Sequence, residues 1–369
     1  MQVNEGTYEG LTWEGKYVEI ADIERELDRL WCEALAVAEE HQMPVRSSVL
    51  NLVVHTSSDA DAEQLYETVG RLSSRHPLRA IILSVEPHHQ EPSLHTTMRV
   101  RCSEDPNTGS KVCCEQVLVE ANGEPAKHLR GVVLPLLIPD LPRYLWWMGE
   151  PEYDSATFES LITAADKFIL DSNSFRPSPA TLREALHMSK VSGRVCAVND
   201  VNWIRLWRWL EAVAQLFDDS ALHLHLAGIE RVRVEYAARP GREASPAQAA
   251  LLAGWLFSRL GPKPSASVEL VPVEAPRVFQ GGVVSFEMQT RRASETATFE
   301  VSADKEGEAS AAVARVRVNG EARSERPVMV APRTDAEAFD IALEDCQRDI
   351  SYEEALEIAA QILERETAQ

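Results

Sequence analysis

The chain has 369 residues, of which 44% are hydrophobic and 26% are charged, so it should fold as a globular protein with room for two domains. Its 58 acidic and 37 basic residues give a formal net charge of -21, spread along the chain, which argues against nucleic acid as a partner. No apolar run approaches the roughly 20 residues that span a bilayer, and the N-terminus lacks the features of a secretory signal. We therefore expect a cytoplasmic protein with no membrane partner.

The first half of the chain predicts a helix followed by a β-α-β unit. Apolar residues at three- and four-residue spacings indicate an amphipathic helix over residues 20–41. A strand over 47–56, a helix with a Ser/Asp cap over 57–77 and a strand over 78–87 follow. Because a parallel crossover needs a helix packed on one face of the sheet, the two strands are predicted to be parallel neighbours.

Antiparallel strands should extend this sheet into a mixed one. The runs 93–104 and 110–122 flank the turn-rich sequence DPNTG, which is typical of a hairpin. The other elements expected here are helices near 124–138 and 155–163 and a strand over 166–175. Two prolines and a new helix start follow Phe175, so we predict an N-terminal α/β domain over 1–175 and a C-terminal domain over 176–369.

The second half predicts helices combined with an antiparallel β-meander and a C-terminal helix, so the whole chain is a mixed α/β protein. Expected here are helices over 181–191, 202–218 and 245–260, and strands over 194–200 and 229–238. From residue 265 onward, short alternating runs separated by turns indicate the antiparallel meander. The tail from Asp335 is acidic and helical.

Six cysteines show no CxxC spacing, and no histidine lies at a compact zinc-ligand interval, so we expect no bound metal. Cys113 and Cys114 are adjacent in a strand-like run, where successive side chains point to opposite faces, and a disulfide between them is not expected. We predict buried thiols at Cys32, Cys102, Cys113, Cys114, Cys196 and Cys346.

Common catalytic and cofactor motifs are absent. The sequence contains no GxGxxG after a strand, no GxxxxGK[ST], no HExxH and no GxSxG. The pairs His88 with His89 and His223 with His225 are explained by an exposed loop and by packing. We therefore expect a protein that is not an enzyme and that holds no cofactor.

The segment DLPRYLWWMGEP, residues 140–151, is the first candidate for partner binding. Pro142 favours entry into a strand, and in a strand Trp146 and Trp147 face opposite sides, one towards the core and one towards another layer or a site. Tryptophan serves both cores and interface hot spots. The candidate residues of this segment are Asp140, Pro142, Arg143, Trp146 and Trp147.

The predicted helix in DVNWIRLWRWLEAVAQLFD, residues 200–218, is the second candidate. Asp200 can cap it, and Trp203 and Trp207 share a face. Trp209 projects away from them, with Arg205 and Arg208 interleaved, so we expect at least one aromatic and basic edge at a cleft or partner. A fully enclosed helix between two domains is an equally weighted alternative.

In order and spacing, RSSVLNLVV, HPLRAIIL, DLPRYLWWMGEP, DKFILDSNSF and DVNWIRLWRWLEAVAQLFD resemble the glucose-6-phosphate dehydrogenase assembly protein family, OpcA, over about residues 45 to 290. The resemblance implies a non-catalytic activator that binds glucose-6-phosphate dehydrogenase and promotes its active oligomer, supporting the oxidative pentose phosphate pathway. One departure is Leu210, where the family pattern suggests arginine. The positions that match are Asp140, Leu141, Pro142, Trp146, Trp147, Asp166, Asp171, Asp200, Trp203, Arg205 and Trp209.

Two other functions stay open at this point. A protein or enzyme that binds sugar phosphates would use Arg143, Arg205 or Lys167 around the phosphate, at the strand ends of the N-terminal sheet. A structural scaffold would show only self-association.

Overall fold

The computed structural model describes residues 12–16, 20–37, 45–46, 48–57, 62–73, 75–104, 111–175, 179–191, 197–261, 266–303, 311–344 and 347–367. The chain divides into two compact units. The first comprises Met1–Leu170, Ser192–Val198 and Phe339–Cys346, and the second comprises Asp171–Val191, Asn199–Ala338 and Gln347–Gln369. The fold is mixed α/β, as predicted, with one sheet centred in each unit. The domain boundary at residue 175 stays a prediction.

The first unit is built on a mixed sheet of nine strands. Its strands are β1 (Thr12–Lys16), β2 (Val45–Arg46), β3 (Leu50–Ser57), β4 (Leu78–Glu86), β5 (Ser93–Glu104), β6 (Lys111–Asn122), β7 (Arg143–Trp147), β8 (Lys167–Leu170) and β9 (Ala197–Asp200). They follow the order β1-β5-β6-β4-β3-β7-β8-β9, with β2 beside β6. Parallel pairing of β3 with β4 confirms the β-α-β unit, and antiparallel pairing of β5 with β6 confirms the hairpin. The predicted Ser/Asp cap and the DPNTG turn lie outside the described residues.

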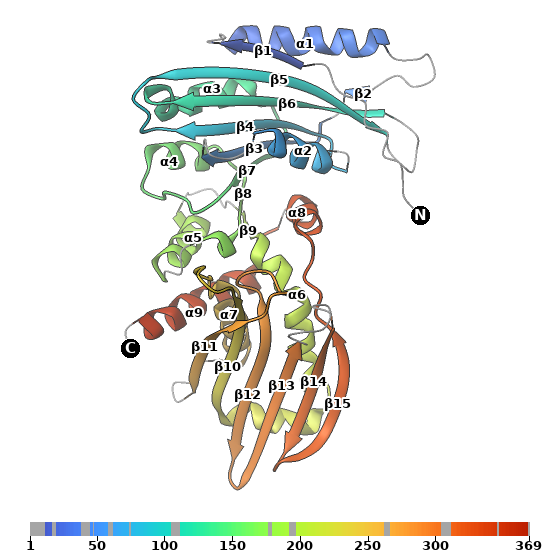
Figure 1. Cartoon of the computed structure of the whole chain (residues 1–369), viewed down its shortest axis with the longest axis vertical. Helices are drawn as coiled ribbons and strands as arrows, with labels where there is room; N and C mark the ends of the chain where they lie inside the picture. Colours follow the sequence, from blue (N-terminus) through green and yellow to red (C-terminus); the bar gives the residue numbers. More distant parts are fainter. Residues whose placement is uncertain are drawn as a thin grey trace. The chain divides into compact units, whose positions relative to one another are not determined.

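Helices cover both faces of this sheet (Figure 1). Glu115 of β6 accepts a hydrogen bond from the indole of Trp31 in α1 (Ile20–Val37), whereas its neighbour Gln116 donates to the Tyr66 carbonyl of α2 (Ala62–Ser73). Successive strand residues point to opposite faces, so α1 and α2 lie on opposite sides. Arg79 is buried beside Glu115 and donates to the Leu136 carbonyl at 2.8 Å, which places α3 (Leu129–Leu136) on the side of α1.

Shorter helices complete the first unit. The turn η1 (Glu124–His128) leads into α3, and α4 (Ala156–Ile162) follows β7. Ser155 caps α4 by accepting from the Phe158 amide at 3.1 Å. Phe158 is fully buried, so α4 packs through it onto the interior of the unit.

The prediction of buried thiols is wrong at two cysteines. Cys113 is disulfide-bonded. Cys32 is an exposed thiol on α1, whereas Cys114 is a buried thiol, as expected, and neither one forms a disulfide. The hairpin register places Cys102 opposite Cys113, and spacing along the chain does not reveal this cross-strand neighbour. Cys196, Cys346 and the side chain of Cys102 lie outside the described residues.

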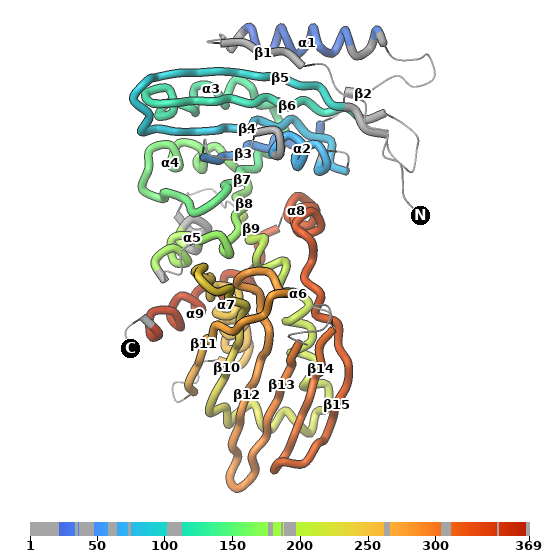
Figure 2. Tube along the Cα trace, viewed as in Figure 1, coloured from blue at the N-terminus to red at the C-terminus, as the bar shows by residue number. Residues whose placement is uncertain are grey.

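The second unit is built on a sheet of six strands. They are β10 (Ile229–Ala238), β11 (Ser267–Glu274), β12 (Val283–Arg292), β13 (Glu295–Ala303), β14 (Ala311–Val318) and β15 (Glu321–Met329). The order is β11-β10-β12-β13-β14-β15. In Figure 2 the colours run from yellow at β10 to red at β15, and β11, which comes after β10 in the chain, lies on the other side of β10. The meander is antiparallel from β12 to β15, but β11 pairs parallel with β10, which corrects the prediction for residues 265–273. The helix α7 (Ala247–Leu260) joins these two strands, and such a crossover returns the chain to the same end of the sheet.

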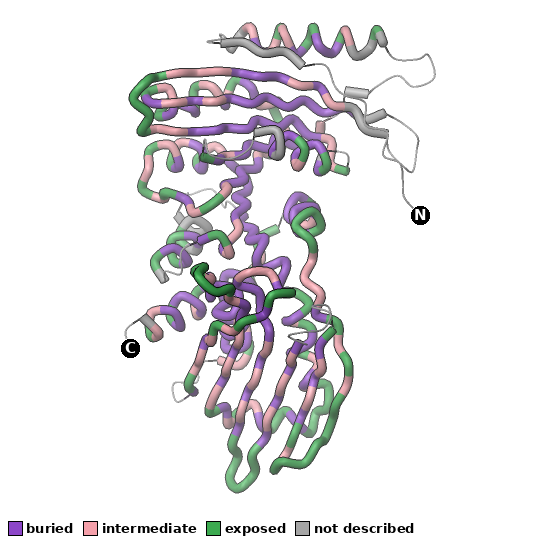
Figure 3. The backbone as a smooth tube through the Cα atoms, viewed as in Figure 1, coloured by how far each residue is buried: buried purple, intermediate pink, exposed green. Residues whose placement is uncertain are grey.

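The remaining helices of the described chain belong wholly or partly to the second unit. They are η2 (Ser172–Ser174), α5 (Pro179–Val191), α6 (Val201–Ala214), η3 (Gln215–Phe217), η4 (Ser220–Gly228), α8 (Asp335–Glu344) and α9 (Ile350–Thr367). Residues along β10, β12, β13 and β14 alternate between buried and half-buried, which Figure 3 shows as alternating colours. One face of the sheet is therefore packed, against α6 and α7, and the other is open.

Paired charges cover the open face. Arg233 reaches Glu269 at 3.4 Å and Glu235 at 3.1 Å, and Arg315 reaches Glu300 at 3.4 Å. Both arginines thus have a neighbour of opposite sign on the same or an adjacent strand.

A close contact between the helices α7 and α9 helps to position the residues of the site. A Cβ atom added to Gly254 of α7 would lie 2.3 Å from the Ala355 carbonyl oxygen of α9. Only glycine allows this approach of the two helices. Trp255, the next residue, is thereby held close to the beginning of α9.

Candidate functional site

The helix α6 carries the aromatic and basic residues of the candidate site. Asp200 caps it by accepting from the Asn202 amide at 2.9 Å, which confirms the predicted cap. Trp203 and Trp209 are each 4% exposed, so both belong to the core. Trp207 is 38% exposed, and Arg208 is exposed beside it. The outward side of α6 therefore carries Trp207 and Arg208, together with the exposed Glu211 and Ala214.

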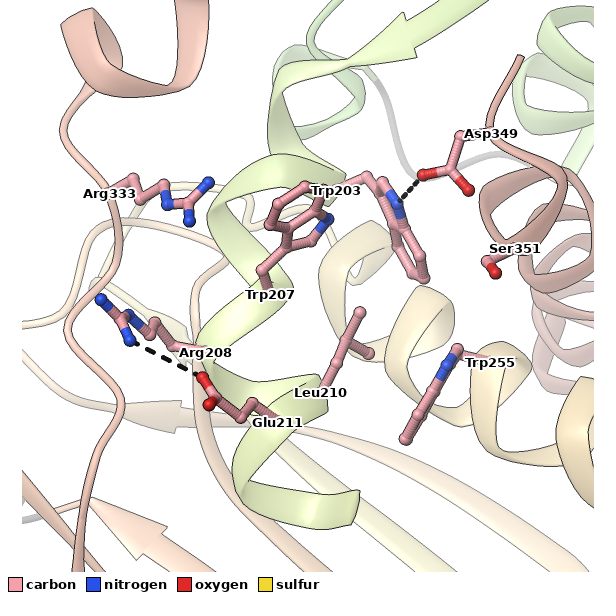
Figure 4. A pocket seen from close by; sticks show the side chains of 9 residues that line it. All are labelled: Trp203, Trp207, Arg208, Leu210, Glu211, Trp255, Arg333, Asp349 and Ser351. Carbon is pink, nitrogen blue, oxygen red and sulfur yellow. Dashed lines mark hydrogen bonds and ion pairs between the residues drawn. The ribbon is translucent and has the colours of Figure 1, made fainter. Parts of the chain in front are cut away.

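An open groove of about 450 Å³ lies against this edge, within the second unit. Figure 4 shows three indoles around it, from Trp203 and Trp207 on α6 and from Trp255 on α7. The helix α9 borders it at its first turn, and the segment before α8 borders it on the side of Trp207. The lining residues are Trp203, Trp207, Arg208, Leu210, Glu211, Trp255, Arg333, Asp349 and Ser351.

Hydrogen bonds hold one side of the groove in place. The indole of Trp203 donates to Asp349 Oδ2 at 2.8 Å, and Asp349 Oδ1 accepts from the Tyr352 amide at 2.9 Å. Asp349 thus caps the beginning of α9 and orients Trp203 at the same time. Both carboxylate oxygens of Asp349 are used by the fold.

The other side of the groove is cationic. The Arg333 guanidinium lies 4.8 Å from the centre of the Trp207 ring, a cation–π geometry. Its Nη1 atom is buried and has no hydrogen-bond partner among the described residues. Arg208 is 3.6 Å from Glu211, an exposed ion pair of little energetic weight.

Arg205 faces inward and is engaged by the fold. Its side chain pairs with Asp171 at 2.9 Å and with Asp335 at 2.8 Å, and the residue is 7% exposed. Burial lowers the pKa of Arg205, but the attraction of Asp171 and Asp335 outweighs it and raises that pKa. Beside Arg205 and Trp209 there is a cavity of only about 10 Å³, which is no larger than one water needs.

Asp200 is a buried carboxyl beneath the site. Besides capping α6, it accepts from the Ser172 amide at 3.0 Å and from the Tyr352 hydroxyl at 3.2 Å. Burial first, and then the nearby Asp171 charge, raise its pKa to about 6, against the opposing effect of the amide hydrogen bonds. The carboxyl therefore changes charge near neutral pH.

The predicted residues of segment 140–151 lie in the first unit. Asp140 and Pro142 are exposed, and Asp140 has a positive φ of 64°. Arg143 pairs with Asp166 at 2.7 Å, which raises the pKa of Arg143. Trp146 and Trp147 are both buried, and their rings lie 4.1 Å from Phe339 and 3.5 Å from His55 respectively. Both indoles therefore contribute to the interior of this unit.

The strand order of the first unit creates a second candidate ligand site. From β3 the chain builds β4 and then β6 on one side and β7 and then β8 on the other, all parallel, with β9 next in the sheet. In such sheets ligands bind at the carboxyl ends of the strands where the order reverses, here between β3 and β7. The sequence predicted parallel neighbours in this domain but not this reversal.

Aromatic side chains occupy the ends of β3 and β7. His55 stacks on Trp147 with a 13° angle between the rings, and burial lowers the pKa of His55 to about 4. The first glycine after β3 is Gly70, so the turn after this strand has no glycine of the GxGxxG type. Lys167 on β8 is buried and donates to the Ala342 carbonyl, so its ammonium group is also engaged.

Some groove residues were not among the predicted ones. Trp255 lies in a helix that the sequence predicts, and its indole was the one available signal. Arg333 and Asp349 lie 119 and 135 residues beyond the end of α6 at Ala214, and no spacing links them to it. The described residues contain no group of three or more His, Cys, Asp or Glu placed to hold a metal ion. Within the same residues, no helix has the length and apolarity to cross a membrane.

Two family models match successive parts of the chain. The glucose-6-phosphate dehydrogenase subunit N-terminal domain matches residues 69–187, and the corresponding C-terminal domain matches residues 196–356. The chain belongs to the OpcA family of glucose-6-phosphate dehydrogenase assembly proteins. The resemblance seen in the sequence is thereby confirmed, and α6 with its groove falls inside the C-terminal family domain.

Relatives in this family carry the name OxPP cycle protein OpcA. One from Synechococcus elongatus is 26% identical over 286 residues, 70% of this chain and 61% of the relative. One from Synechocystis sp. is 30% identical over 149 residues, 40% of this chain and 30% of the relative. The matches thus span less than two thirds of these relatives. A solved oxidoreductase structure from Magnetospirillum magnetotacticum aligns over 86% of this chain and 99% of that one, with 10% sequence identity and a TM-score of 0.37. A likeness this low supports no conclusion about the fold or function of this chain.

Proposed function

We propose that this protein is a non-catalytic assembly factor that binds glucose-6-phosphate dehydrogenase in the cytoplasm and promotes its active oligomeric state, in support of the oxidative pentose phosphate pathway. The observation that carries the proposal is the match of both family domains, in order, over residues 69–187 and 196–356. Such a factor must bind the active oligomer more tightly than the inactive form.

The first unit supports a role without hydride transfer. Its strand order suits a dinucleotide at the ends of β3 and β7, but the phosphate-binding turn needs glycines for close approach of the backbone. The sequence after β3 has no glycine before Gly70, and the rings of His55 and Trp147 stack on each other near the carboxyl ends of the two strands. We infer that the unit keeps the architecture for positioning a partner and not for holding NADP.

The groove on α6 is the proposed partner surface. Tryptophan and arginine are the residue types most often found at interface hot spots, and Trp207 and Arg208 are the exposed pair of α6. The remaining candidate residues of this helix, Trp203, Arg205 and Trp209, would support the surface from within. Asp140 and Pro142 are a second exposed pair that a large partner could contact.

The alternative of a sugar-phosphate site has less support. The three cations that it would use are Arg143, Arg205 and Lys167, and each one already has a partner within the protein. A phosphate would have to displace Asp166, Asp171 or Asp335 from its arginine, at the cost of a charge-assisted bond.

The test is a titration of the purified protein into glucose-6-phosphate dehydrogenase from the same organism. Dehydrogenase activity and the mass of the complex are followed together, by initial rates and by light scattering after size-exclusion chromatography. We expect both to rise to a plateau at a fixed molar ratio. An unchanged activity and mass would contradict the proposal, and an oligomer formed by this protein alone would instead indicate a self-associating scaffold.

A second measurement tests the absence of catalysis. Isothermal titration of the protein with NADP+ and with glucose 6-phosphate should show no saturable binding at ligand concentrations that saturate the dehydrogenase. Formation of NADPH from these two compounds by this protein alone, followed by its absorbance, would overturn the non-catalytic role.

A further inference from the structure

We infer that the α6 groove takes an acidic peptide segment in which a large apolar side chain stands next to a carboxylate. Its lining includes Arg333 and Arg208 as cations, and Glu211 and Asp349 as carboxylates that already have partners within the protein. For the identity of the partner this inference rests on the proposed function, and the segment would then belong to the dehydrogenase. The chemistry of the segment follows from three features of the groove.

The first feature is an excess of hydrogen-bond donors that have no acceptor among the described residues. Arg333 Nη1 is buried without a partner among the described residues. The hydrogen bonds among those residues include none from the indole nitrogens of Trp207 or Trp255. Both oxygens of Asp349 are occupied, by Trp203 and by the Tyr352 amide. A ligand that satisfies this groove would therefore bring acceptors, and the half-buried guanidinium of Arg333 pairs most strongly with a carboxylate.

The second feature is the apolar floor. Trp203, Leu210 and Trp255 surround the space into which Ser351 points in Figure 4. A groove of about 450 Å³ accommodates one large side chain and part of its neighbours. Indole walls favour an aromatic or long aliphatic side chain, because these bury the most apolar area.

The third feature distinguishes a polypeptide from a small molecule. The described residues include only five exposed large hydrophobic side chains. Trp207 lines the groove, and Ile350, 65% exposed, lies between the lining residues Asp349 and Ser351 in the sequence. A polypeptide can cover exposed apolar side chains in and around a groove, whereas an enclosed small molecule contacts only those that line it.

The pairing of charges also distinguishes this groove from the open face of the six-stranded sheet. On that face Arg233 and Arg315 are already paired with glutamates of the same sheet. In the groove Arg333 stacks on the Trp207 ring and forms no ion pair with the described residues. Arg208 is held weakly by Glu211, and the carboxylate of Asp349 is engaged by Trp203 and by the Tyr352 amide. In a chain of net charge -21, these are cations that remain available for an acidic partner.

The experiment compares charge reversals at two arginines. Arg333→Glu should weaken binding of the dehydrogenase by about tenfold or more, as expected for a central contact. Arg323→Glu, which makes the same change of net charge at an exposed position on β15, should leave the affinity unchanged. Trp207→Ala should weaken binding similarly, with Leu224→Ala, another exposed apolar position, as its control. Thermal melts establish that all four variants are folded.

A peptide titration keeps the inference separate from the identity of the partner. The tryptophan emission of the wild-type protein is followed with Ac-Phe-Glu-Glu-NH2 and with Ac-Phe-Lys-Lys-NH2. We expect saturation by the acidic peptide only, and loss of that response in Arg333→Glu. If the dehydrogenase does not bind but the acidic peptide does, the proposed function fails and the groove chemistry stands. If the acidic peptide does not saturate, or if the dehydrogenase binds Arg333→Glu as tightly as the wild type, the inference is overturned.

Discussion

Asparagine in place of Asp200 removes a titrating group from beneath α6 while keeping its shape. Asp200 is 1% exposed, and its pKa is raised to about 6 from an ordinary value of 3.8. A carboxyl whose pKa is raised by folding stabilises the fold fully below the unfolded pKa. That contribution is lost as the pH rises through the folded pKa. The relevant window therefore extends from about pH 4 to about pH 6.

The magnitude follows from the same two values. A pKa of about 6 against 3.8 corresponds to about 3 kcal/mol of stability that the wild type loses on ionisation. The asparagine of Asp200→Asn can still accept from the Ser172 and Asn202 amides through its carbonyl oxygen, and its amide group can donate to the Tyr352 hydroxyl. The variant should therefore match the wild type near pH 4 and exceed its stability by up to about 3 kcal/mol near pH 7.5.

The assay is urea unfolding of both proteins across this range of pH, with hydrogen exchange of the α6 amides to report on the second unit. Comparing variant with wild type at each pH cancels the titration of every other group. A stability difference that stays constant from pH 4 to pH 7.5 would refute the reasoning, because the carboxyl would then have the same pKa in both states.

Three further predictions concern other contacts of the two units. Arg205→Ala should lower the free energy of unfolding by about 2 to 3 kcal/mol in urea denaturation, because it leaves Asp171 and Asp335 without their cation, whereas Arg208→Ala should cost less than about 1 kcal/mol. Gly254→Ala should lower the melting temperature, at a cost of about 1 to 3 kcal/mol, because its Cβ would meet the Ala355 carbonyl of α9; Gly131→Ala, with open space around it, should not. As the pH falls from about 6.5 to about 4, the first unit of the wild type should lose up to about 3 kcal/mol of stability, and His55→Gln should not show this loss. Because folding lowers the pKa of His55, the neutral imidazole stabilises the fold above pH 6.5, and this contribution is lost as the pH falls. Hydrogen exchange of the β3 amides measures the effect, and an equal pH dependence in variant and wild type would contradict it.

Local patterns in the sequence predicted much of the fold. The β-α-β unit, the β5–β6 hairpin and the cap at Asp200 each depend on residues within one short stretch, where periodicity and capping chemistry act directly. The parallel position of β11 was not predictable in this way. Its alternation is compatible with either pairing direction, and the crossover through α7 decides which one forms.

The candidate site was predictable only in part. Trp207 and Arg208 belong to a segment that the sequence singled out, but so do Trp203, Arg205 and Trp209, which the fold buries. The helical period assigns the residues of α6 to different faces, but it does not determine which face packs against the six-stranded sheet. Arg333 and Asp349 join the groove from distant segments, through contacts that no spacing predicts.

By itself, then, the sequence determined the family, the mixed α/β class and the helix that carries the tryptophans, since these depend on motifs and periods along the chain. Only the tertiary structure decided which indole reaches solvent and which arginine has a donor without an acceptor. It also decided that Cys113 forms a disulfide. Exposure and pairing depend on what packs against a side chain, and the neighbours that matter here come from α7, α9 and the segment before α8.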